Sequence, residues 1–338
     1  MPADRFATRQ KPSEKPYNSG FFSFRSGLLI LMLVYRGFSH KVPGATVLTI
    51  GNFDGVHLGH RALLARLKET ARDRKLTPTV LTFEPHPRDF FARESAPARL
   101  STLREKLELL ADEGVAQAYV VHFNARFAQL SAEDFITRVL VDSLHVRHLI
   151  IGDDFRFGAG RRGNFALLHA AGERHGFTVE AMDCVTLQGE RASSSAVRTA
   201  LAAGDMDRAA SLLGRPYSID GRVVRGDKMG RQFGFATANI RIKHSNPPVL
   251  GVFAVEVGGL PGGTRRGVAN VGIRPTANKL PRPILEVHLF DFSADIYGAH
   301  LNVRFLHKLR NEVHFADIEA LKAQIAVDVR TAKNYFKL

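Results

Sequence analysis

The chain has 338 residues, a hydrophobic fraction of 45% and a formal net charge of +14. This length is long for one domain and sufficient for two, each with its own core, and the hydrophobic fraction is that of a globular protein. The charge favours anionic partners, either nucleic acid or nucleotides, but there is no block of basic residues typical of a nucleic-acid-binding tail. Cys184 is the only cysteine, which excludes an internal disulfide and favours a cytoplasmic location.

Residues 1–31 are expected to be an N-terminal extension, either disordered or foreign to the native protein. Residues 1–20 are polar and rich in Pro, Lys, Arg and Ser, a composition that cannot build a packed core. The apolar run at 28–34 is too short to span a bilayer, and no clear cleavage site follows it. No signal peptide and no membrane contact are therefore expected.

From residue 45 to about 185, strand-like and helix-like segments alternate, which predicts a parallel sheet with helices on its faces. The expected strands are 47–50, 79–83, 118–123, 148–152 and 178–182, and the expected helices are 60–74, 101–113 and 131–144. Capping pairs begin the last two helices, Thr102 with Glu105 and Ser131 with Asp134. This pattern is typical of a Rossmann-like half, whose ligand lies at the carboxyl ends of the strands.

The loop Gly51-Asn52-Phe53-Asp54-Gly55-Val56-His57-Leu58-Gly59-His60 joins the first strand to the first helix. A helix N-terminus offers unpaired N–H groups and a positive dipole end, and glycines let the backbone approach a ligand. His57 and His60 stand three apart, so both imidazoles can face one ligand. The loop therefore predicts a phosphate site.

Further loops follow other strands of this half. Thr82–Pro87 ends a strand with two prolines, and 152–158 carries two phenylalanines with basic residues behind it. The second loop is either a surface turn or a cradle for an aromatic, phosphorylated ligand. The run Arg191–Arg198 places consecutive serines before a helix, where they act as caps at least.

After Gly204 the pattern changes to short β segments at 217–225, 251–257, 266–271, 285–291 and 301–307. A helix ending at Gly214-Arg215-Pro216 marks the expected boundary. A last helix at about 316–335 should turn Ile318, Leu321, Ile325 and Val329 to one face. Short strands at this spacing predict a small closed β-barrel. In the strand around Glu286, this glutamate, His288 and Phe290 should share the face opposite the core.

The loop at 51–60 resembles the His-x-Gly-His signature of nucleotidylyltransferases, in the form seen in bacterial bifunctional riboflavin kinase/FAD synthetases. The similarity runs from about Met32 to the C-terminus, and family members begin near Met32, which makes it an alternative start. Arg191–Arg198 is similar to the second nucleotidylyl motif, Arg-x-x-Ser-Ser-(Ser/Thr)-x-x-Arg. Gly234–Asn239 resembles the riboflavin kinase motif Gly-x-Pro-Thr-Ala-Asn with Ala236 in place of proline, and 309–315 matches Leu-Arg-x-Glu-x-x-Phe.

The resemblance implies an FMN adenylyltransferase domain at 32–204, a linker at 205–216 and a riboflavin kinase domain at 217–338. It implies that His57, His60 and Arg198 stabilise charge in adenylyl transfer, and that Glu286 is the base for the ribityl hydroxyl. The residues implied at the adenylyltransferase ATP are Gly51, Asn52, Phe53, Asp54, Gly59, Ser193, Ser194 and Ser195, and those at its flavin or nucleotide are Asp154, Phe155, Phe157 and Gly158. In the kinase, Gly226, Gly230, Arg231 and Gly234 are implied at ATP, Arg310, Glu312 and Phe315 at the flavin, and Thr237 and Asn239 at Mg²⁺.

The implied ligands are riboflavin, FMN, FAD and ATP, without nucleic acid. Two other interpretations remain open from the residues. One is a different His-x-Gly-His nucleotidylyltransferase fused to an unrelated barrel. The other is a basic RNA-binding protein whose barrel binds oligonucleotide.

Overall fold

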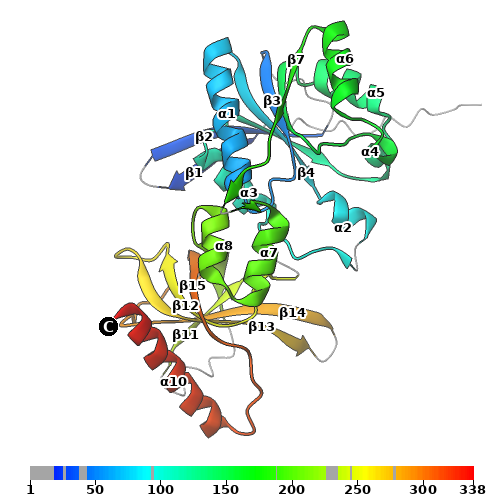
Figure 1. The fold of residues 1–338 in the computed structure, drawn as a ribbon. Coiled ribbons are helices and arrows are strands. Elements are labelled where there is room, and N and C mark those ends of the chain that lie inside the picture. The colour runs from blue at the N-terminus through cyan, green and yellow to red at the C-terminus, as the bar shows by residue number, and fades with distance from the viewer. Residues whose placement is uncertain are drawn as a thin grey trace, which may run out of the picture.

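The structure is a computed structural model that describes residues 19–25, 28–37, 44–92, 95–187, 189–225, 235–243, 246–276 and 279–338. An α/β half and a β-barrel half lie at opposite ends, and helices α7 and α8 lie between them (Figure 1). This arrangement confirms the fold class expected from the sequence.

The α/β half is built on a seven-stranded sheet with the order β1-β2-β5-β4-β3-β6-β7. Its strands are β1 (Ser19–Arg25), β2 (Leu28–Arg36), β3 (Thr46–Ile50), β4 (Thr77–Glu84), β5 (Gln117–His122), β6 (Val146–Gly152) and β7 (Thr178–Met182). All neighbours from β2 to β7 pair in parallel, while β1 pairs antiparallel with β2. The chain runs outward from β3 through β4 to β5 and then returns to β6, so the switch point lies beside β3, where such sheets bind ligands.

Helices cover both faces of this sheet. They are α1 (Leu58–Arg74), α2 (Pro87–Phe91), α3 (Leu103–Asp112), α4 (Ala125–Ala128), α5 (Ala132–Asp134), the π-helical η2 (Phe135–Val141), the 3-10 turn η3 (Ala159–Arg161) and α6 (Phe165–His175). One apolar cluster joins α1 and α3 to one face, and a second joins η2 and α6 to the other. Thr102 and Glu105 form the expected capping box, and Ser131 caps the helix that follows.

Two features of this half differ from the sequence prediction. Strands β1 and the start of β2 lie within the segment that was expected to lack structure, and residues 1–18 lie outside the described residues. The predicted single helix at 131–144 is a short α-helix that continues as a π-helix. A short hairpin of β8 (Thr186–Leu187) and β9 (Glu190–Arg191) follows the sheet.

The second half is a closed antiparallel barrel with the order β10-β11-β14-β13-β12-β15. Its strands are β10 (Tyr217–Val224), β11 (Thr237–Arg241), β12 (Gly251–Gly258), β13 (Arg265–Thr276), β14 (Lys279–Leu289) and β15 (His300–Arg310). Alternation along β14 places Leu285, Val287 and Leu289 inside the barrel, as predicted. Strand β11 was not among the predicted strands.

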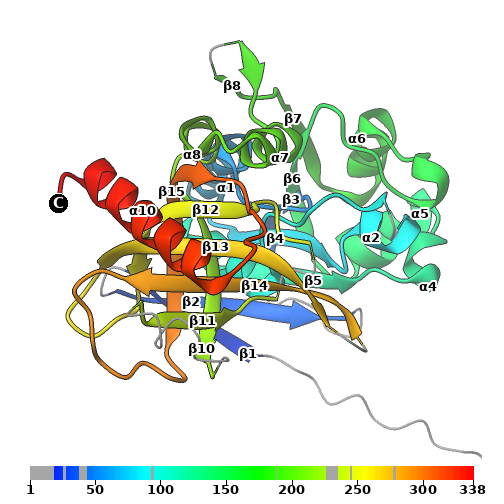
Figure 2. The same cartoon turned by 90° about the horizontal axis from the view of Figure 1, so that it is seen from below.

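Helix α10 (Ile318–Phe336) packs outside the barrel against β12, β13 and β15, as seen from below in Figure 2. The face predicted for it is wrong at its start, because Ile318 is 55% exposed. The helix packs through Val329, Ala332 and Phe336 near its end, where Val252 and Phe290 meet it.

Helices α7 (Ser194–Ala203) and α8 (Met206–Leu213) share one hydrophobic cluster with the barrel interior. Val197, Leu201 and Leu212 are buried in the same cluster as Ile219 and Phe253 of the barrel. The segment 205–216, expected to be a linker, is therefore mostly a packed helix. In the described part of the chain, no helix is long and apolar enough to cross a membrane.

Candidate functional site

The loop between β3 and α1 holds two stacked histidines. The ring centroids of His57 and His60 are 3.7 Å apart, and Phe53, buried in the core, lies 4.9 Å from His60. The buried Nδ1 atoms of both histidines have no hydrogen-bond partner among the described residues. The described residues therefore leave one ring nitrogen of each imidazole without a hydrogen bond, which is unusual for a buried polar atom.

A cavity of about 450 Å³ opens at this loop, a size suited to a nucleotide. Gly51, Phe53, His57, Gly59 and His60 line one wall. The other walls come from three segments that follow strands or precede α7, namely 152–155, 182–185 and 191–193. The cavity thus gathers residues from the carboxyl ends of β3, β6 and β7, where a ligand was expected.

Both histidines are uncharged near neutral pH. Burial lowers the pKa of His57 to about 4, and Arg191, Arg198 and Arg215 oppose the raising effect of Asp54. Burial and the neighbouring His57 hold the pKa of His60 well below its usual value. The imidazoles can therefore contribute N–H donors and polar ring atoms to a phosphate, rather than a full positive charge.

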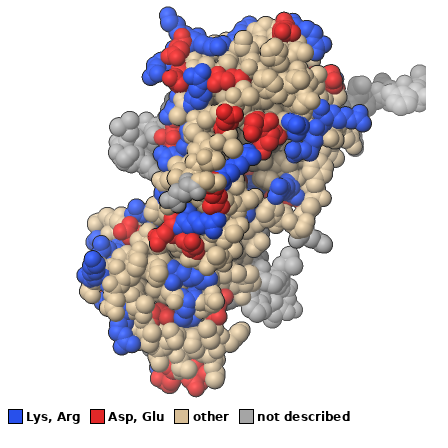
Figure 3. Space-filling view, in the orientation of Figure 1, with Lys and Arg blue, Asp and Glu red and all other residues tan. Residues whose placement is uncertain are grey.

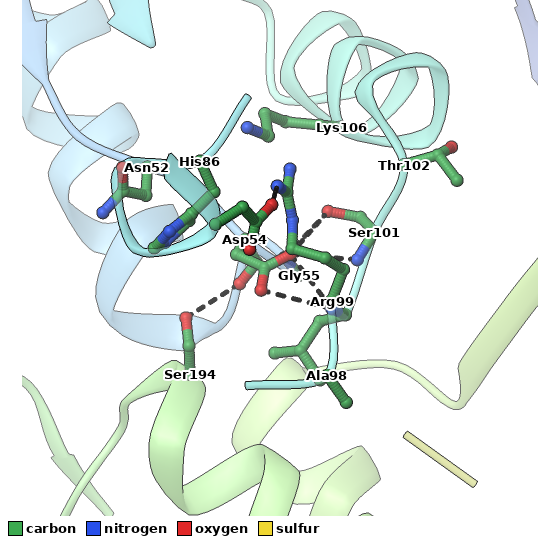
Figure 4. A network of polar contacts seen from close by, with 12 residues as sticks. Asn52, Asp54, Gly55, His86, Ala98, Arg99, Ser101, Thr102, Lys106 and Ser194 are labelled. Atoms are coloured by element: carbon green, nitrogen blue, oxygen red, sulfur yellow. Dashed lines mark hydrogen bonds and ion pairs between the residues drawn. The ribbon is translucent and has the colours of Figure 1, made fainter. Parts of the chain in front are cut away.

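Asp54 is the centre of a buried polar network (Figure 4). Its carboxylate accepts hydrogen bonds from the backbone N–H groups of Leu100 and Ser101 and pairs with Arg198. Burial alone would raise the pKa of Asp54, but Arg198, Arg99 and these two N–H groups together lower it. Only 1% of this side chain is exposed, so the structure places Asp54 beneath the loop and not in the cavity.

Arg198 is likewise held by the protein itself. Its Nε donates to the carbonyl of Ala98 at 2.6 Å, and its Nη2 donates to Asp54. The residue does not line the cavity, whereas Arg191, the first arginine of the same motif, does. The expected role of Arg198 as a charge that faces the ligand is not supported by this geometry, because Asp54 already neutralises it.

The three motif serines have different surroundings. Ser193 lines the cavity and caps α7 by accepting from the Ala196 N–H. Ser194 donates its hydroxyl to the Asp54 carbonyl at 2.9 Å. Ser195 is exposed and does not line the cavity. Of the three, Ser193 is in the best position to contact a nucleotide.

The loop 152–158 divides in a similar way. Asp154 and Phe155 line the cavity, while Phe157 is only 7% exposed and packs in the sheet core. Gly158, at φ +71°, leaves no room for a Cβ against the backbone of Ala132. Asp154 also accepts from Arg191 at 3.1 Å. Phe157 and Gly158 thus shape the loop, and Asp154 and Phe155 are its cavity-facing members.

A second layer of buried charged groups lies beside the loop and was not predicted. Lys106 is fully buried, and its Nζ donates to Thr82 Oγ1, which in turn donates to the Asn52 carbonyl. Burial, with Arg99 nearby, lowers the pKa of Lys106 to about 8. The spacing of Lys106 from Leu103, Leu107 and Leu110 places it on the buried face of α3, which is the signal that could have revealed it.

The candidate kinase residues form one row across the outside of the barrel. Strand register places Asn239 opposite Glu286, Glu286 opposite Asn270, Asn270 opposite Val252 and Val252 opposite Arg310. Thr237 lies on the same face, two residues from Asn239. Residues from three sequence motifs that lie far apart in the chain are therefore neighbours on one surface of the barrel.

The far end of this row is closed by the segment after β15. Glu312 accepts from Asn270 Nδ2 at 3.4 Å, and any side chain at Gly272 would collide with its carboxylate. Arg310 makes two hydrogen bonds to Asp328 of α10, at 2.8 and 2.7 Å, and its guanidinium lies 5.7 Å from the Phe315 ring centroid. Asp328, 5% exposed, was missed by sequence reasoning. Gly226, Gly230, Arg231 and Gly234 lie outside the described residues.

The oxygen atoms of this row suit a magnesium–nucleotide complex. Thr237 and Asn239 supply a hydroxyl and an amide oxygen, Glu286 supplies a carboxylate, and the buried Asn270 Oδ1 has no partner among the described residues. Mg²⁺ prefers such oxygen ligands and usually keeps water and substrate phosphates as further ligands. These residues therefore fit the ion, although no group of three His, Cys, Asp or Glu side chains forms a metal cage in the described ranges.

Together, a parallel-sheet cavity with a His-x-Gly-His loop and a barrel with a separate row of oxygen-bearing side chains are the features of a two-site enzyme of nucleotide chemistry. Family models agree with this division. FAD synthetase matches residues 39–196, and riboflavin kinase matches residues 213–336.

Curated relatives extend the match across both halves. A bifunctional riboflavin kinase/FMN adenylyltransferase of Escherichia coli is 52% identical over 86% of this chain and 93% of its own length. The protein of the same description from Haemophilus influenzae is 48% identical over 90% and 99%, and that from Pseudomonas fluorescens is 50% identical over 89% and 97%. The chain belongs to the family of bifunctional riboflavin kinase/FMN adenylyltransferases. Neither of the two rival interpretations is supported.

A solved structure shares the arrangement of both halves. The crystal structure of a protein named macrolide-efflux protein, from Streptococcus pneumoniae, is 27% identical and superposes with a TM-score of 0.77, covering 89% of this chain and 99% of that one. The chain order of sheet, helical pair and barrel is therefore not peculiar to this protein.

Proposed function

We propose that this enzyme phosphorylates riboflavin with ATP to give FMN in the barrel, and then transfers AMP from a second ATP to FMN in the α/β half to give FAD and pyrophosphate. The observation that carries the proposal is the pairing of two separate sites in one chain of this family. One is the histidine-lined cavity, and the other is the Asn239–Glu286–Asn270 row. We place the adenylyltransferase domain at 32–204 and the kinase domain at 217–338.

In adenylyl transfer, an oxygen of the FMN phosphate attacks the α-phosphorus of ATP in line. The new P–O bond forms as the bond from the α-phosphorus to the pyrophosphate oxygen breaks. The FMN phosphate is already ionised near neutral pH, so no side chain need remove a proton. His57 and His60 stabilise the developing charge as uncharged hydrogen-bond donors, which their low pKa values and their place in the cavity wall support.

Cations near this site have separate roles in the proposal. Arg191 and Ser193 line the cavity and meet the nucleotide phosphates, whereas Arg198 holds the loop through Asp54. Phe155 and Gly51 supply apolar and close backbone contacts to the same ligand. This assignment moves the ligand-facing charge from the second arginine of the motif to the first.

In riboflavin phosphorylation, Glu286 takes the proton of the ribityl 5′-hydroxyl. The hydroxyl oxygen attacks the γ-phosphorus of ATP, and ADP leaves. Glu286 lies between Asn239 and Asn270 on adjacent strands, which orients the carboxylate toward the same outer surface. Thr237 and Asn239 would hold Mg²⁺, which when bound neutralises charge on the ATP phosphates. Arg310, fixed by Asp328, and Glu312 border the flavin end of the row.

We also propose nucleotides, and not nucleic acid, as the anionic partners, in a cytoplasmic enzyme. On the face drawn in Figure 3, lysine and arginine side chains are interspersed with aspartate and glutamate and do not gather into one patch. A backbone-tracking groove for nucleic acid needs a continuous positive surface.

The test is incubation with riboflavin, ATP and Mg²⁺, followed by chromatography of the products. FMN should appear first and FAD second, and supplied FMN should give FAD and pyrophosphate without riboflavin. A protein that binds flavin and forms neither product would overturn the proposal. Omission of Mg²⁺ with a chelator present should stop FMN formation.

A further inference from the structure

The backbone between Phe53 and Val56 is held in an unfavourable conformation directly before His57. Phe53, Gly55 and Val56 have φ angles of +48°, +80° and +42°. Only glycine adopts this region freely, and for a β-branched residue such as Val56 it is rare. Such a turn persists only where surrounding contacts determine it. The position of His57 therefore depends on what holds the four residues before it.

One side of this turn is held from within the α/β half. The Asp54 carboxylate accepts from the N–H groups of Leu100 and Ser101, and the Gly55 N–H donates to Ser101 Oγ. These bonds fix the Asp54 side chain and the Gly55 N–H, but not the carbonyl groups of the turn.

The carbonyl groups are held by residues that follow the sheet in the chain. Ser194 Oγ donates to the Asp54 carbonyl at 2.9 Å. The Arg215 guanidinium donates to the next two carbonyls, through Nη2 to Gly55 at 2.6 Å and through Nη1 to Val56 at 3.0 Å. One planar side chain thus spans both peptide groups that lead into His57.

Arg215 lies between the end of α8 and the first strand of the barrel. Its backbone N–H donates to the Ala210 carbonyl of α8, and its Nη1 also donates to the Leu213 carbonyl. Two residues later, Tyr217 begins β10, is 4% exposed and pairs with Phe305 of the neighbouring strand β15. The arginine therefore connects the first barrel strand to the histidine loop of the other half.

We propose that Arg215 is a positioning residue for adenylyl transfer, which fixes the Gly55 and Val56 carbonyls from the barrel side and so sets the place of His57 in the nucleotide cavity. This inference rests on the proposed adenylyl transfer at that cavity. Phosphorylation of riboflavin occurs on the outer face of the barrel and does not involve this contact.

A purely structural role of Arg215 would have different effects on stability and activity from a positioning role. If Arg215 only joined the two halves, its loss would lower stability and would affect both activities in proportion to the folded fraction. A positioning role instead lowers kcat for adenylyl transfer with little change in KM, because misplaced histidines act on the transition state more than on bound substrate.

The experiment compares full-length R215M and R215K with wild type and with a control, R304M. Arg304 lies on β15 of the barrel, and its guanidinium pairs with Glu256 at 3.3 Å and donates to Thr264 rather than to the histidine loop. Each protein is assayed for FAD formation from FMN and ATP, for FMN formation from riboflavin and ATP, and for melting temperature. Lysine keeps the charge but lacks the planar fork that spans two carbonyls.

For R215M, kcat of FAD formation should fall by roughly 10- to 100-fold, the scale of a misplacement of about 1 Å. Its KM for FMN should stay within about twofold, and FMN formation should match wild type. R215K should show the same split to a smaller degree, and R304M should show none. An R215M protein with unchanged kcat, or with equal loss of both activities, would overturn the inference. If R215M does not fold, an R215K protein with normal kcat for FAD formation would overturn the inference. A wild-type protein that makes no FAD would instead refute the proposed function.

Discussion

Replacement of Asp54 by asparagine would remove the anion at the centre of the network in Figure 4. Asparagine keeps the size of the side chain, but its amide nitrogen is a donor. The Leu100 and Ser101 N–H groups and Arg198 are also donors, so at least one of them loses its acceptor. We expect D54N to destabilise the α/β half and to suppress FAD formation, while the outer face of the barrel still phosphorylates riboflavin.

The magnitude follows from the burial of both partners. The side chains of Asp54 and Arg198 are 1% and 15% exposed. Removal of one member of a buried ion pair costs about 3–5 kcal/mol, because the remaining charge stays buried without its partner. Since the pKa of Asp54 is lowered in the folded protein, this stabilisation is complete above about pH 4 and is lost as the pH falls through the folded pKa.

Hydrogen exchange of amides in β3 and α1 would measure the local opening free energy without assuming that the whole chain unfolds in one step. D73N is the matched control, because Asp73 is 63% exposed and its loss should change stability by less than about 0.5 kcal/mol. D54N/R198M removes both charges, so its cost should be smaller than the sum of the single variants by about 1–3 kcal/mol. Strictly additive costs, or a D54N protein as stable as D73N, would refute the buried-pair argument.

Three further predictions test the two sites separately. H57A and H60A should each lower FAD formation while FMN accumulates from riboflavin, and normal FAD yield from the double variant would remove both histidines from the mechanism. E286Q should lower riboflavin phosphorylation by roughly 10²–10⁴-fold with flavin binding retained and FAD still formed from supplied FMN, which fluorescence titration and product chromatography would check. Burial lowers the pKa of His57, and that of the buried His86 at the start of α2, to about 4, so NMR titration should show neither ring protonated at pH 6. Because the unfolded state protonates first, stability should fall as the pH drops from about 6.5 towards 4.

Periodicity predicted the parallel strands well because those strands are buried and bounded by glycine or proline. The strands expected at 47–50 and 148–152 are Thr46–Ile50 and Val146–Gly152 in the structure. Strand β11 escaped prediction because Thr237 and Asn239 carry polar oxygens on the outer face, which weakens the apolar signal of a strand. The exposure of Ile318 was not predicted either, because helical spacing does not tell how far the barrel surface extends along α10.

The site residues could be predicted as a set, but not in their separate roles. A motif places Arg191 and Arg198 at the same loop, and only the fold shows that Asp54 neutralises the second of them. Asp328 offers no signal at all in one sequence, because a single acidic residue on an amphipathic helix is normally exposed to solvent. Its partner Arg310 lies on β15, and the position of this strand relative to α10 depends on the closure of the barrel.

The division of labour between the halves is also less clean than the change of composition at Gly204 suggests. Helix α8 buries Met206, Ala209, Leu212 and Leu213 in the cluster that fills the barrel. A cut at residue 204 would expose this apolar face on the kinase side, or leave α7 without its partner on the other. The two halves are therefore joined by a packed interface and not by an open linker, and its polar contacts include those of Ser194 and Arg215 with the carbonyls of the histidine loop. The two reactions can therefore take place at separate sites, while the histidine loop used for adenylyl transfer still depends on a folded barrel for its conformation.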